Sequence, residues 1–179
     1  MIKRLKNAPD ISGGEKKAAV VVLYTTSSNP PEILFVVRKI SERDRWSGHV
    51  AFPGGRWEPK DKSLLDTAMR ELLEETGLRL DKDMELVDIL SEVSPKNEPE
   101  LKVIPFLART SSKPLIRLSE ELSTYFWASI KDLEKMEAIV ELPDGSKKSV
   151  LGFRSGNWII WGMTARILEQ ALPIISRTL

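Results

Sequence analysis

Three glutamates lie close together in the segment RELLEETG, which spans residues 70–77. In a helix, Glu71, Glu74 and Glu75 project their carboxylates within an arc of about 100°. Like charges at these spacings destabilise a helix by roughly 0.2–0.5 kcal/mol per pair, so the cluster needs an offsetting partner. Clustered carboxylate oxygens are the ligands that Mg²⁺ or Mn²⁺ takes, so one such partner is a hard divalent cation.

A solvated acidic face is the other interpretation of this cluster, with Arg70 and nearby lysines screening the charge. The residues before the helix favour the metal site. Pro53, Gly54 and Gly55 predict a turn that brings the backbone carbonyl of Gly55 beside the cation. Arg70 is placed to orient a neighbouring carboxylate.

The helix that carries the glutamates has start and stop signals of its own. Ser63 followed by Asp66 resembles a capping box, and Gly77 is a typical helix end. Four apolar side chains fall on one side of this helix and predict the face that packs against the core. They are Leu65, Ala68, Met69 and Leu72.

The other elements follow from apolar runs separated by Pro and Gly clusters. Strands are expected at 18–26, 32–39, 49–53, 84–93, 100–110 and 123–129. A short helical turn is expected at 129–136, a hairpin at 137–153 and a C-terminal helix from Trp158 to Leu172. Paired strands with helices at intervals predict an α+β or mixed α/β fold, with helices on both faces of a mixed sheet.

Length and composition narrow the function classes. The 179 residues fit a single domain over 1–179. The 27 Lys and Arg balance the 26 Asp and Glu, so neither nucleic acid nor an anionic membrane is an expected partner. The absence of cysteine excludes disulfides and thiolate chemistry. The N-terminal residues lack the pattern of a secretory signal, and we expect a soluble, cytoplasmic protein.

The segment from Gly55 to Leu78 resembles the Nudix box, commonly written G-x5-E-x7-R-E-U-x-E-E-x-G-U with U an aliphatic residue. The half RELLEETGL matches at every fixed position. Asp61 stands where glutamate is expected, and eight residues instead of seven separate it from Arg70. The resemblance implies the Nudix α/β/α sandwich with a mixed sheet, and hydrolysis of a nucleoside diphosphate linked to another group.

The same resemblance implies roles for the helix residues. Glu71, Glu74 and Glu75 become ligands of Mg²⁺ or Mn²⁺, with the backbone carbonyl of Gly55 as an additional ligand. Glu74 is also counted as catalytic, together with Arg70 as the residue that orients the carboxylates. The cation would neutralise diphosphate oxygens and lower the pKa of bound water.

The stretch AFPGGRWEPKDKSLLDTAMRELLEETGL further resembles the coenzyme A pyrophosphatase branch of this family, as does WGMTARIL at 161–168. The phenylalanine-proline-glycine-glycine turn, the aspartate and the threonine-alanine pair before the arginine are usual in that branch. Coenzyme A or acyl-coenzyme A is therefore the leading substrate. ADP-ribose or an NADH-like dinucleotide is the alternative, and a non-catalytic nucleotide-binding module is a second.

A further carboxylate from a later loop often serves this family as ligand or general base. Glu121 lies six residues before Trp127, which matches the usual spacing of the branch. It is the preferred candidate, with Glu120 and Glu98 as alternatives. A solvent-exposed turn residue is the other interpretation of Glu121.

Four arginines surround the approach to the box, and a guanidinium suits phosphate oxygens. Arg45 and Arg56 are the preferred substrate-binding candidates among Arg38, Arg43, Arg45 and Arg56. Trp46 is a candidate for stacking on an adenine, with a place in the core as the alternative. His49 is expected to be structural. A homodimer is compatible with the sequence, because dimers are common in this family and among soluble proteins.

Overall fold

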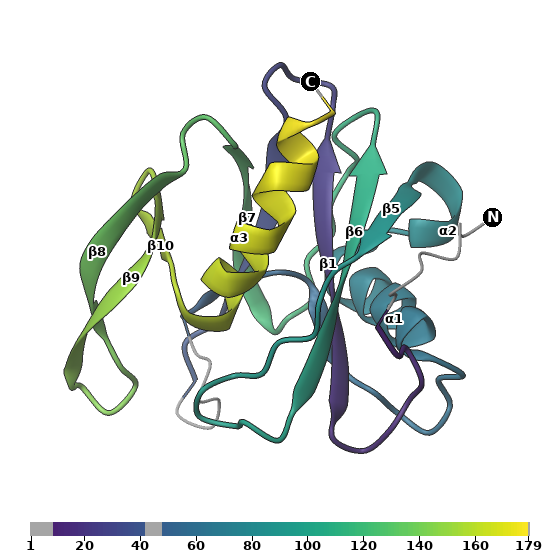
Figure 1. Cartoon of the computed structure of the whole chain (residues 1–179), viewed down its shortest axis with the longest axis horizontal. Coiled ribbons are helices and arrows are strands. Elements are labelled where there is room, and N and C mark those ends of the chain that lie inside the picture. Colours follow the sequence, from purple (N-terminus) through teal and green to yellow (C-terminus); the bar gives the residue numbers. More distant parts are fainter. Residues whose placement is uncertain (1–8, 42–47, 179) are drawn as a thin grey trace.

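The computed structural model describes residues 9–41 and 48–178 (Figure 1). The strands in these ranges are β1 (Lys17–Thr25), β2 (Glu32–Arg38), β3 (Val50–Ala51), β4 (Gly54–Arg56), β5 (Glu85–Ile89), β6 (Lys102–Thr110), β7 (Leu122–Ser129), β8 (Glu134–Glu141), β9 (Lys147–Ser155) and β10 (Trp158–Ile160). The helices are α1 (Leu64–Thr76), α2 (Leu80–Asp83) and α3 (Gly162–Ser176).

The larger sheet is mixed and runs in the order β3-β2-β1-β6-β5, with β4 paired to β1 and β7 paired to β2. β1 and β6 are parallel along their whole length, from Lys17 beside Lys102 to Thr25 beside Thr110. The other pairs of this sheet are antiparallel. β8, β9 and β10 form a second, antiparallel sheet.

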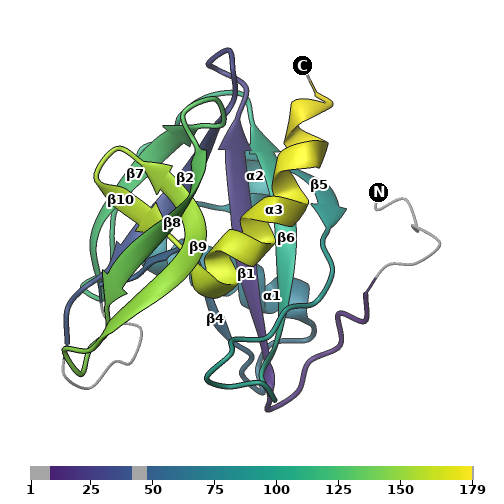
Figure 2. The same ribbon diagram turned by 60° about the vertical axis from the view of Figure 1, so that its left-hand side comes forward.

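Side chains of β1 alternate between two hydrophobic cores, because successive residues of a strand point to opposite faces. Ala18, Val20, Val22 and Tyr24 pack in the core that contains α3. Ala19, Val21 and Leu23 pack in the core that contains α1. The two helices therefore cover opposite faces of the sheet (Figures 1 and 2), which confirms the expected fold class.

One expected helical segment is wrong, and the C-terminal helix is confirmed with a later start. Residues 130–133 form a turn, and β8 begins at Glu134 where a helical turn was expected. Met136, Ala138 and Val140 are half-buried while their neighbours are exposed, so this stretch has the period of a strand. The C-terminal helix begins at Gly162, because Trp158–Ile160 pairs with β9 as β10.

The remaining boundaries shift by a few residues. The strand expected at 49–53 is shorter and is followed by β4, which includes both glycines of the predicted turn. The strand expected at 84–93 ends at Ile89. The hairpin at 137–153 is confirmed as β8 and β9, and α3 continues through Pro173. No helix in the described ranges is both long enough and apolar enough to cross a membrane.

Candidate functional site

Helix α1 has the caps that the sequence predicts. The side chain of Ser63 accepts a hydrogen bond from the backbone N–H of Asp66 at 3.4 Å. Gly77 ends the helix with a φ of 74°, and its N–H donates to the carbonyl of Leu73 at 2.9 Å. The caps fix where the helix begins and ends, and so fix the directions of the three glutamates.

The buried side of α1 differs slightly from the predicted stripe. Ala68 and Leu72 are fully buried as expected. Leu64 is the third fully buried apolar side chain, whereas Leu65 and Met69 are partly buried at the edge of the same core.

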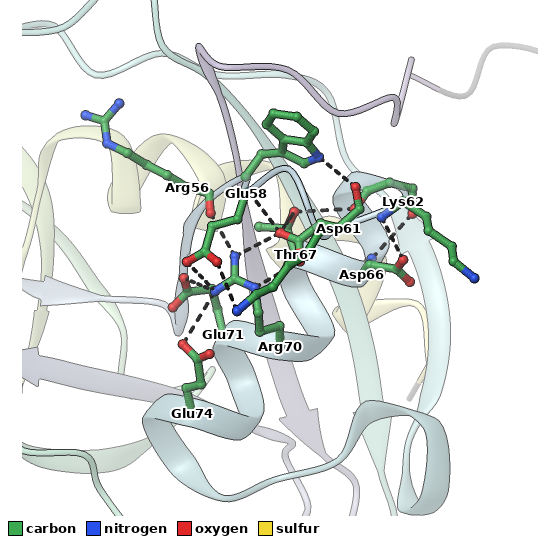
Figure 3. A network of polar contacts seen from close by, with 12 residues as sticks. Arg56, Glu58, Asp61, Lys62, Asp66, Thr67, Arg70, Glu71 and Glu74 are labelled. Carbon is green, nitrogen blue, oxygen red and sulfur yellow. Dashed lines mark hydrogen bonds and ion pairs between the residues drawn. The ribbon is translucent and has the colours of Figure 1, made fainter.

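Arg70 lies at the centre of the polar network that joins α1 to the chain segment before it (Figure 3). Its Nε and Nη2 donate to the two carboxylate oxygens of Asp61, each at 2.9 Å. Nη2 also donates to the backbone carbonyl of Arg56 at 2.9 Å. Nη1 donates to Glu71 at 2.8 Å and lies 3.4 Å from an oxygen of Glu74. The predicted orienting role of Arg70 agrees with this geometry.

Asp61 anchors that arginine, a role the sequence did not assign. Its Oδ2 also accepts hydrogen bonds from the hydroxyl of Thr67 at 2.9 Å and from the N–H of Glu58 at 3.0 Å. The hydrogen bonds from Arg70 lower the pKa of the Asp61 carboxyl to about 2. Asp61 is therefore ionised and holds the guanidinium in one orientation.

Glu75 is the most buried of the three glutamates, with 4% of its surface exposed. The N–H of Gly54 donates to its Oε2 at 3.1 Å. Burial raises the pKa of Glu75 to about 8, and the charge of Glu71 acts in the same direction. Burial also raises the pKa of Glu71 itself, despite the hydrogen bond from Arg70. Nearby positive charge therefore does not offset the effect of burial on the pKa values of these two carboxyl groups.

Both glycines of β4 are required by close approaches. A Cβ built on Gly55 would lie 2.4 Å from the carboxyl group of Glu71. A Cβ built on Gly54 would lie 2.3 Å from the backbone carbonyl of Ala19. β4 therefore packs directly between β1 and the acidic side of α1, which places the backbone of Gly55 against Glu71 as the predicted metal site requires.

The expected ligands of a cation are only partly assembled. In residues 9–41 and 48–178, no three acidic or histidine side chains are grouped closely enough to hold a metal ion. Glu74 is half-exposed beside Arg70, Glu71 is half-buried, and Glu75 is buried. The donors nevertheless fit a hard cation, because the carboxylates of Glu71 and Glu75 both lie against the glycine backbone of β4.

Of the candidate bases, Glu121 faces the acidic cluster. It precedes β7, its side chain is exposed, and its charge raises the pKa of both Glu71 and Glu75. Glu120 is also exposed. Glu98 instead accepts two hydrogen bonds from Nη2 of Arg56, at 2.6 and 2.8 Å. The structure therefore pairs one candidate base with a candidate substrate-binding residue.

The arginine candidates have different outcomes. Arg45 and Trp46 lie outside the described residues. Arg56 is half-exposed beside the site and is held by Glu98. The sequence analysis preferred Arg45 and Arg56 to Arg38, but the charge of Arg38 lies close enough to lower the pKa of Glu75. Its position at the end of a buried strand was the available signal.

A cavity of about 190 Å³, which we call the inner cavity, opens beside strand β4. Arg38, Gly54, Gly55 and Arg56 line it on the side of the acidic cluster. Trp161 lines it near the start of α3 and contacts the ring of His49 edge-on, with 4.9 Å between ring centroids. The sequence analysis assigned no role to Trp161, because this residue is far from β4 in the chain and approaches it only in the folded structure.

Comparisons with known proteins agree with this geometry. A model of the NUDIX domain matches residues 15–146. The mitochondrial coenzyme A diphosphatase NUDT8 of Mus musculus is 29% identical over 153 residues, which cover 82% of this chain and 71% of the mouse protein. An uncharacterized protein of Schizosaccharomyces pombe is 38% identical over 109 residues, which cover 58% of this chain and only 33% of that protein.

Among solved structures, RenU, a Nudix hydrolase from M. smegmatis, superimposes with a TM-score of 0.60 at 13% identity. The match covers 97% of each chain. At this identity the likeness shows the fold alone.

Proposed function

Because the chain belongs to the Nudix family and is a pyrophosphatase, we propose that it hydrolyses the diphosphate of coenzyme A or acyl-coenzyme A at the acidic side of α1. The similarity to the mouse coenzyme A diphosphatase over 82% of the chain supports this substrate. The observation that carries the proposal is the approach of the half-buried Glu71 and the buried Glu75 to the glycines of β4.

The proposed cofactor is Mg²⁺ or Mn²⁺, held by Glu71, Glu74, Glu75 and the carbonyl of Gly55. A bound cation would neutralise the diphosphate oxygens and lower the pKa of a bound water. The raised pKa values of Glu71 and Glu75 support this assignment, because a cation favours the charged form of both carboxylates.

The chain's own residues then have defined tasks. Arg70, fixed by Asp61, holds Glu71 in place and lies near the catalytic candidate Glu74. Arg56 binds diphosphate oxygens after exchanging its partner Glu98 for them, and Arg45 and Trp46 remain candidates for substrate contacts.

Glu121 is the proposed base. It takes a proton from water as the water oxygen bonds to one phosphorus. The bridging P–O bond breaks, and the products are two phosphate monoesters.

Two alternatives remain from the sequence. An ADP-ribose or NADH-like substrate would use the same diphosphate chemistry with a different second half. A non-catalytic nucleotide-binding module would not need Glu71, Glu74 and Glu75 together, and their retention argues against it. One functional unit over residues 1–179, a homodimer and a cytoplasmic location remain predictions.

Incubation with Mg²⁺ and a substrate panel tests the proposal. The panel contains coenzyme A, acyl-coenzyme A, ADP-ribose, NADH and nucleoside triphosphates, and the products are separated by chromatography. We expect coenzyme A compounds to be cleaved fastest. Preferential cleavage of ADP-ribose would select the first alternative, and no turnover of any compound would favour the binding module.

A further inference from the structure

A second and larger cavity, of about 640 Å³, lies between the β8–β9 hairpin and the start of α3. We call it the hairpin cavity. Figures 1 and 2 show the hairpin standing beside the N-terminal end of α3, away from α1. Its apolar lining comes from the hairpin, from α3 and from the chain between β5 and β6. The apolar lining residues are Pro95, Leu142, Pro143, Val150, Leu151, Trp161, Met163 and Ala165.

The hairpin cavity adjoins the inner cavity. Five residues line both of them, and Trp161 and Met163 are two of these shared residues. The inner cavity reaches Gly54 and Gly55, which lie against the acidic cluster. The two cavities are therefore adjacent, and together their linings extend from Gly54 and Gly55 to the hairpin.

The inner cavity suits a slender chain better than a nucleoside. Its floor is formed by small and branched apolar side chains from β1, β3 and β6. The one hydroxyl in the lining, that of Thr164, already donates to the carbonyl of Val50 at 3.1 Å. The other polar side chains of the lining are Arg38, His49 and Arg56, so an arm that alternates amide groups with methylenes meets both hydrogen-bond donors and apolar surface there.

The hairpin cavity offers apolar surface beyond that passage. Leu151 is 64% exposed although it lines the cavity, so a ligand that covers it removes apolar area from water. The acidic side chains of the lining are engaged elsewhere. Glu169 pairs with Lys135 at 2.8 Å, and Asp144 accepts hydrogen bonds from Ser146.

One cation of the lining also has a structural partner. Arg166 donates to the carbonyl of Ser94 at 2.6 Å and so ties the chain before Pro95 to α3. Gln170 makes two further hydrogen bonds to the backbone of Ser91. These contacts hold the chain between β5 and β6 against α3.

We propose that the hairpin cavity binds the apolar acyl chain of an acyl thioester substrate, whose diphosphate lies at the acidic cluster and whose linking arm passes through the inner cavity. This inference rests on the proposed function and adds a specificity site to it. Leu151 and Met163 are the proposed specificity-determining contacts. The enzyme then prefers long-chain acyl-coenzyme A to free coenzyme A.

A chain-length series tests the inference. kcat/KM is measured with free, acetyl-, hexanoyl- and decanoyl-coenzyme A for the wild type, Leu151→Asp and Ile139→Asp. We expect kcat/KM of the wild type to rise with chain length, by up to about fourfold per buried methylene. Leu151→Asp should reduce the value for the decanoyl compound by about tenfold or more and leave that for free coenzyme A within about twofold.

Ile139→Asp is the matched control. Ile139 is an aliphatic residue of the same hairpin, 74% exposed, and it does not line the cavity. It should leave the whole series unchanged. Circular dichroism verifies that both variants fold, which the exposure of both positions favours.

Three outcomes would overturn the inference. One is a wild-type rate that does not depend on chain length. Another is an equal loss with free and decanoyl-coenzyme A in Leu151→Asp, which would place the common part of the substrate in the cavity. The third is an equal effect of the two variants.

Failure of the proposed function itself would look different. No coenzyme A compound would then be hydrolysed, and calorimetric binding of decanoyl-coenzyme A to the wild type and Leu151→Asp would decide the inference separately. Equal affinity of the two proteins would overturn it. Weaker binding by the variant would support an acyl site in a protein of another activity.

Discussion

Hydrogen bonding and burial shift the pKa values of individual carboxyl groups at this site in opposite directions. The pKa of Asp61 is lowered to about 2 because Arg70 donates hydrogen bonds to both of its carboxylate oxygens. Glu75 has the opposite shift, to a pKa of about 8, because burial penalises its charge. One carboxylate is thus committed to structure, whereas the other is prepared for a partner that brings positive charge.

Replacement of Glu75 by Gln should flatten the pH dependence of stability in the metal-free protein. The pKa of about 8 in the folded state lies above the ordinary value of 4.5 for a glutamate, so the folded state holds the proton more tightly. Stability from Glu75 is complete below about pH 4.5 and is lost as pH rises through about 8, by on the order of a few kcal/mol. Urea denaturation in EDTA between pH 5 and 9 measures this slope.

The same variant should lose most of its hydrolytic activity in Mg²⁺ while keeping its fold. Removal of a carboxylate that fixes the cation typically costs orders of magnitude in rate. An unchanged rate would place the metal site elsewhere. An unchanged pH slope would show that Glu75 is not the titrating group.

Asp61→Asn should destabilise the protein by roughly 3–5 kcal/mol, because it removes the buried carboxylate that accepts hydrogen bonds from Nε and Nη2 of Arg70 and leaves only Glu71, at Nη1, as a close anion. The two side chains are only 4% and 13% exposed. In the wild type, this stability is present above about pH 3.8 and is lost as pH falls through about 2. Urea denaturation at pH 7 compares the two proteins.

Asp81→Asn is the control for that experiment. Asp81 pairs with Arg79 at 3.1 Å, but the two side chains are 43% and 50% exposed. Solvent screens an exposed pair of this kind, so Asp81→Asn should lower stability much less than Asp61→Asn. Similar losses in Asp61→Asn and Asp81→Asn would contradict the anchoring role of Asp61.

At the scale of elements, the site is the meeting of a short strand with a helix. β4 supplies two glycines and a backbone N–H, and α1 supplies the carboxylates. Gly54 and Glu75 are 21 residues apart in the chain but 3.1 Å apart in space. The pairing of β4 with the first half of β1 fixes that approach.

Gly55→Ala should lower activity and Mg²⁺ affinity by about 10- to 100-fold, because its methyl group would displace the carboxyl group of Glu71. Steady-state rates at varied Mg²⁺ measure both effects. Gly14→Ala is the matched control, since a Cβ there meets only the side chain of Lys17 at an ordinary 3.4 Å. Equal behaviour of the two variants would show that the approach of β4 to Glu71 is not needed.

At the scale of the whole molecule, two cores on opposite faces of one sheet hold α1 and α3 in fixed positions. The acidic cluster lies on α1, the inner cavity is lined by strands of the larger sheet and the start of α3, and the hairpin cavity is lined by α3 and the β8–β9 hairpin. The proposed diphosphate site and the proposed acyl site therefore lie on different parts of the fold.

Mg²⁺ should stabilise the whole chain, because a ligand that binds only the folded state adds RT ln(1 + [L]/Kd) to the free energy of unfolding. At a concentration 100 times Kd this is about 2.7 kcal/mol. Thermal unfolding with and without Mg²⁺ measures it as a rise in Tm. The double variant Glu71→Gln, Glu75→Gln should show no rise, and an equal rise would contradict binding at these residues.

Local signals determined α1 and its chemistry. The caps at Ser63 and Gly77 act over three or four residues, and the spacing of Glu71, Glu74 and Glu75 follows from the helical period. The same period identified two of the three fully buried apolar side chains of the helix, Ala68 and Leu72. Such features are set by neighbours in the chain, so the sequence alone predicted them and, through the box, the family.

Only the tertiary structure decided which distant groups meet. The hydrogen bond from the hydroxyl of Thr164 to the carbonyl of Val50 joins residues 114 positions apart. Trp161 lines the same cavity as β4 because α3 packs on that face of the sheet. Asp61 was visible as a departure from the box, but its hold on Arg70 depends on how the loop before α1 folds back. These contacts arise from strand pairing and core packing, which no local pattern of residues encodes.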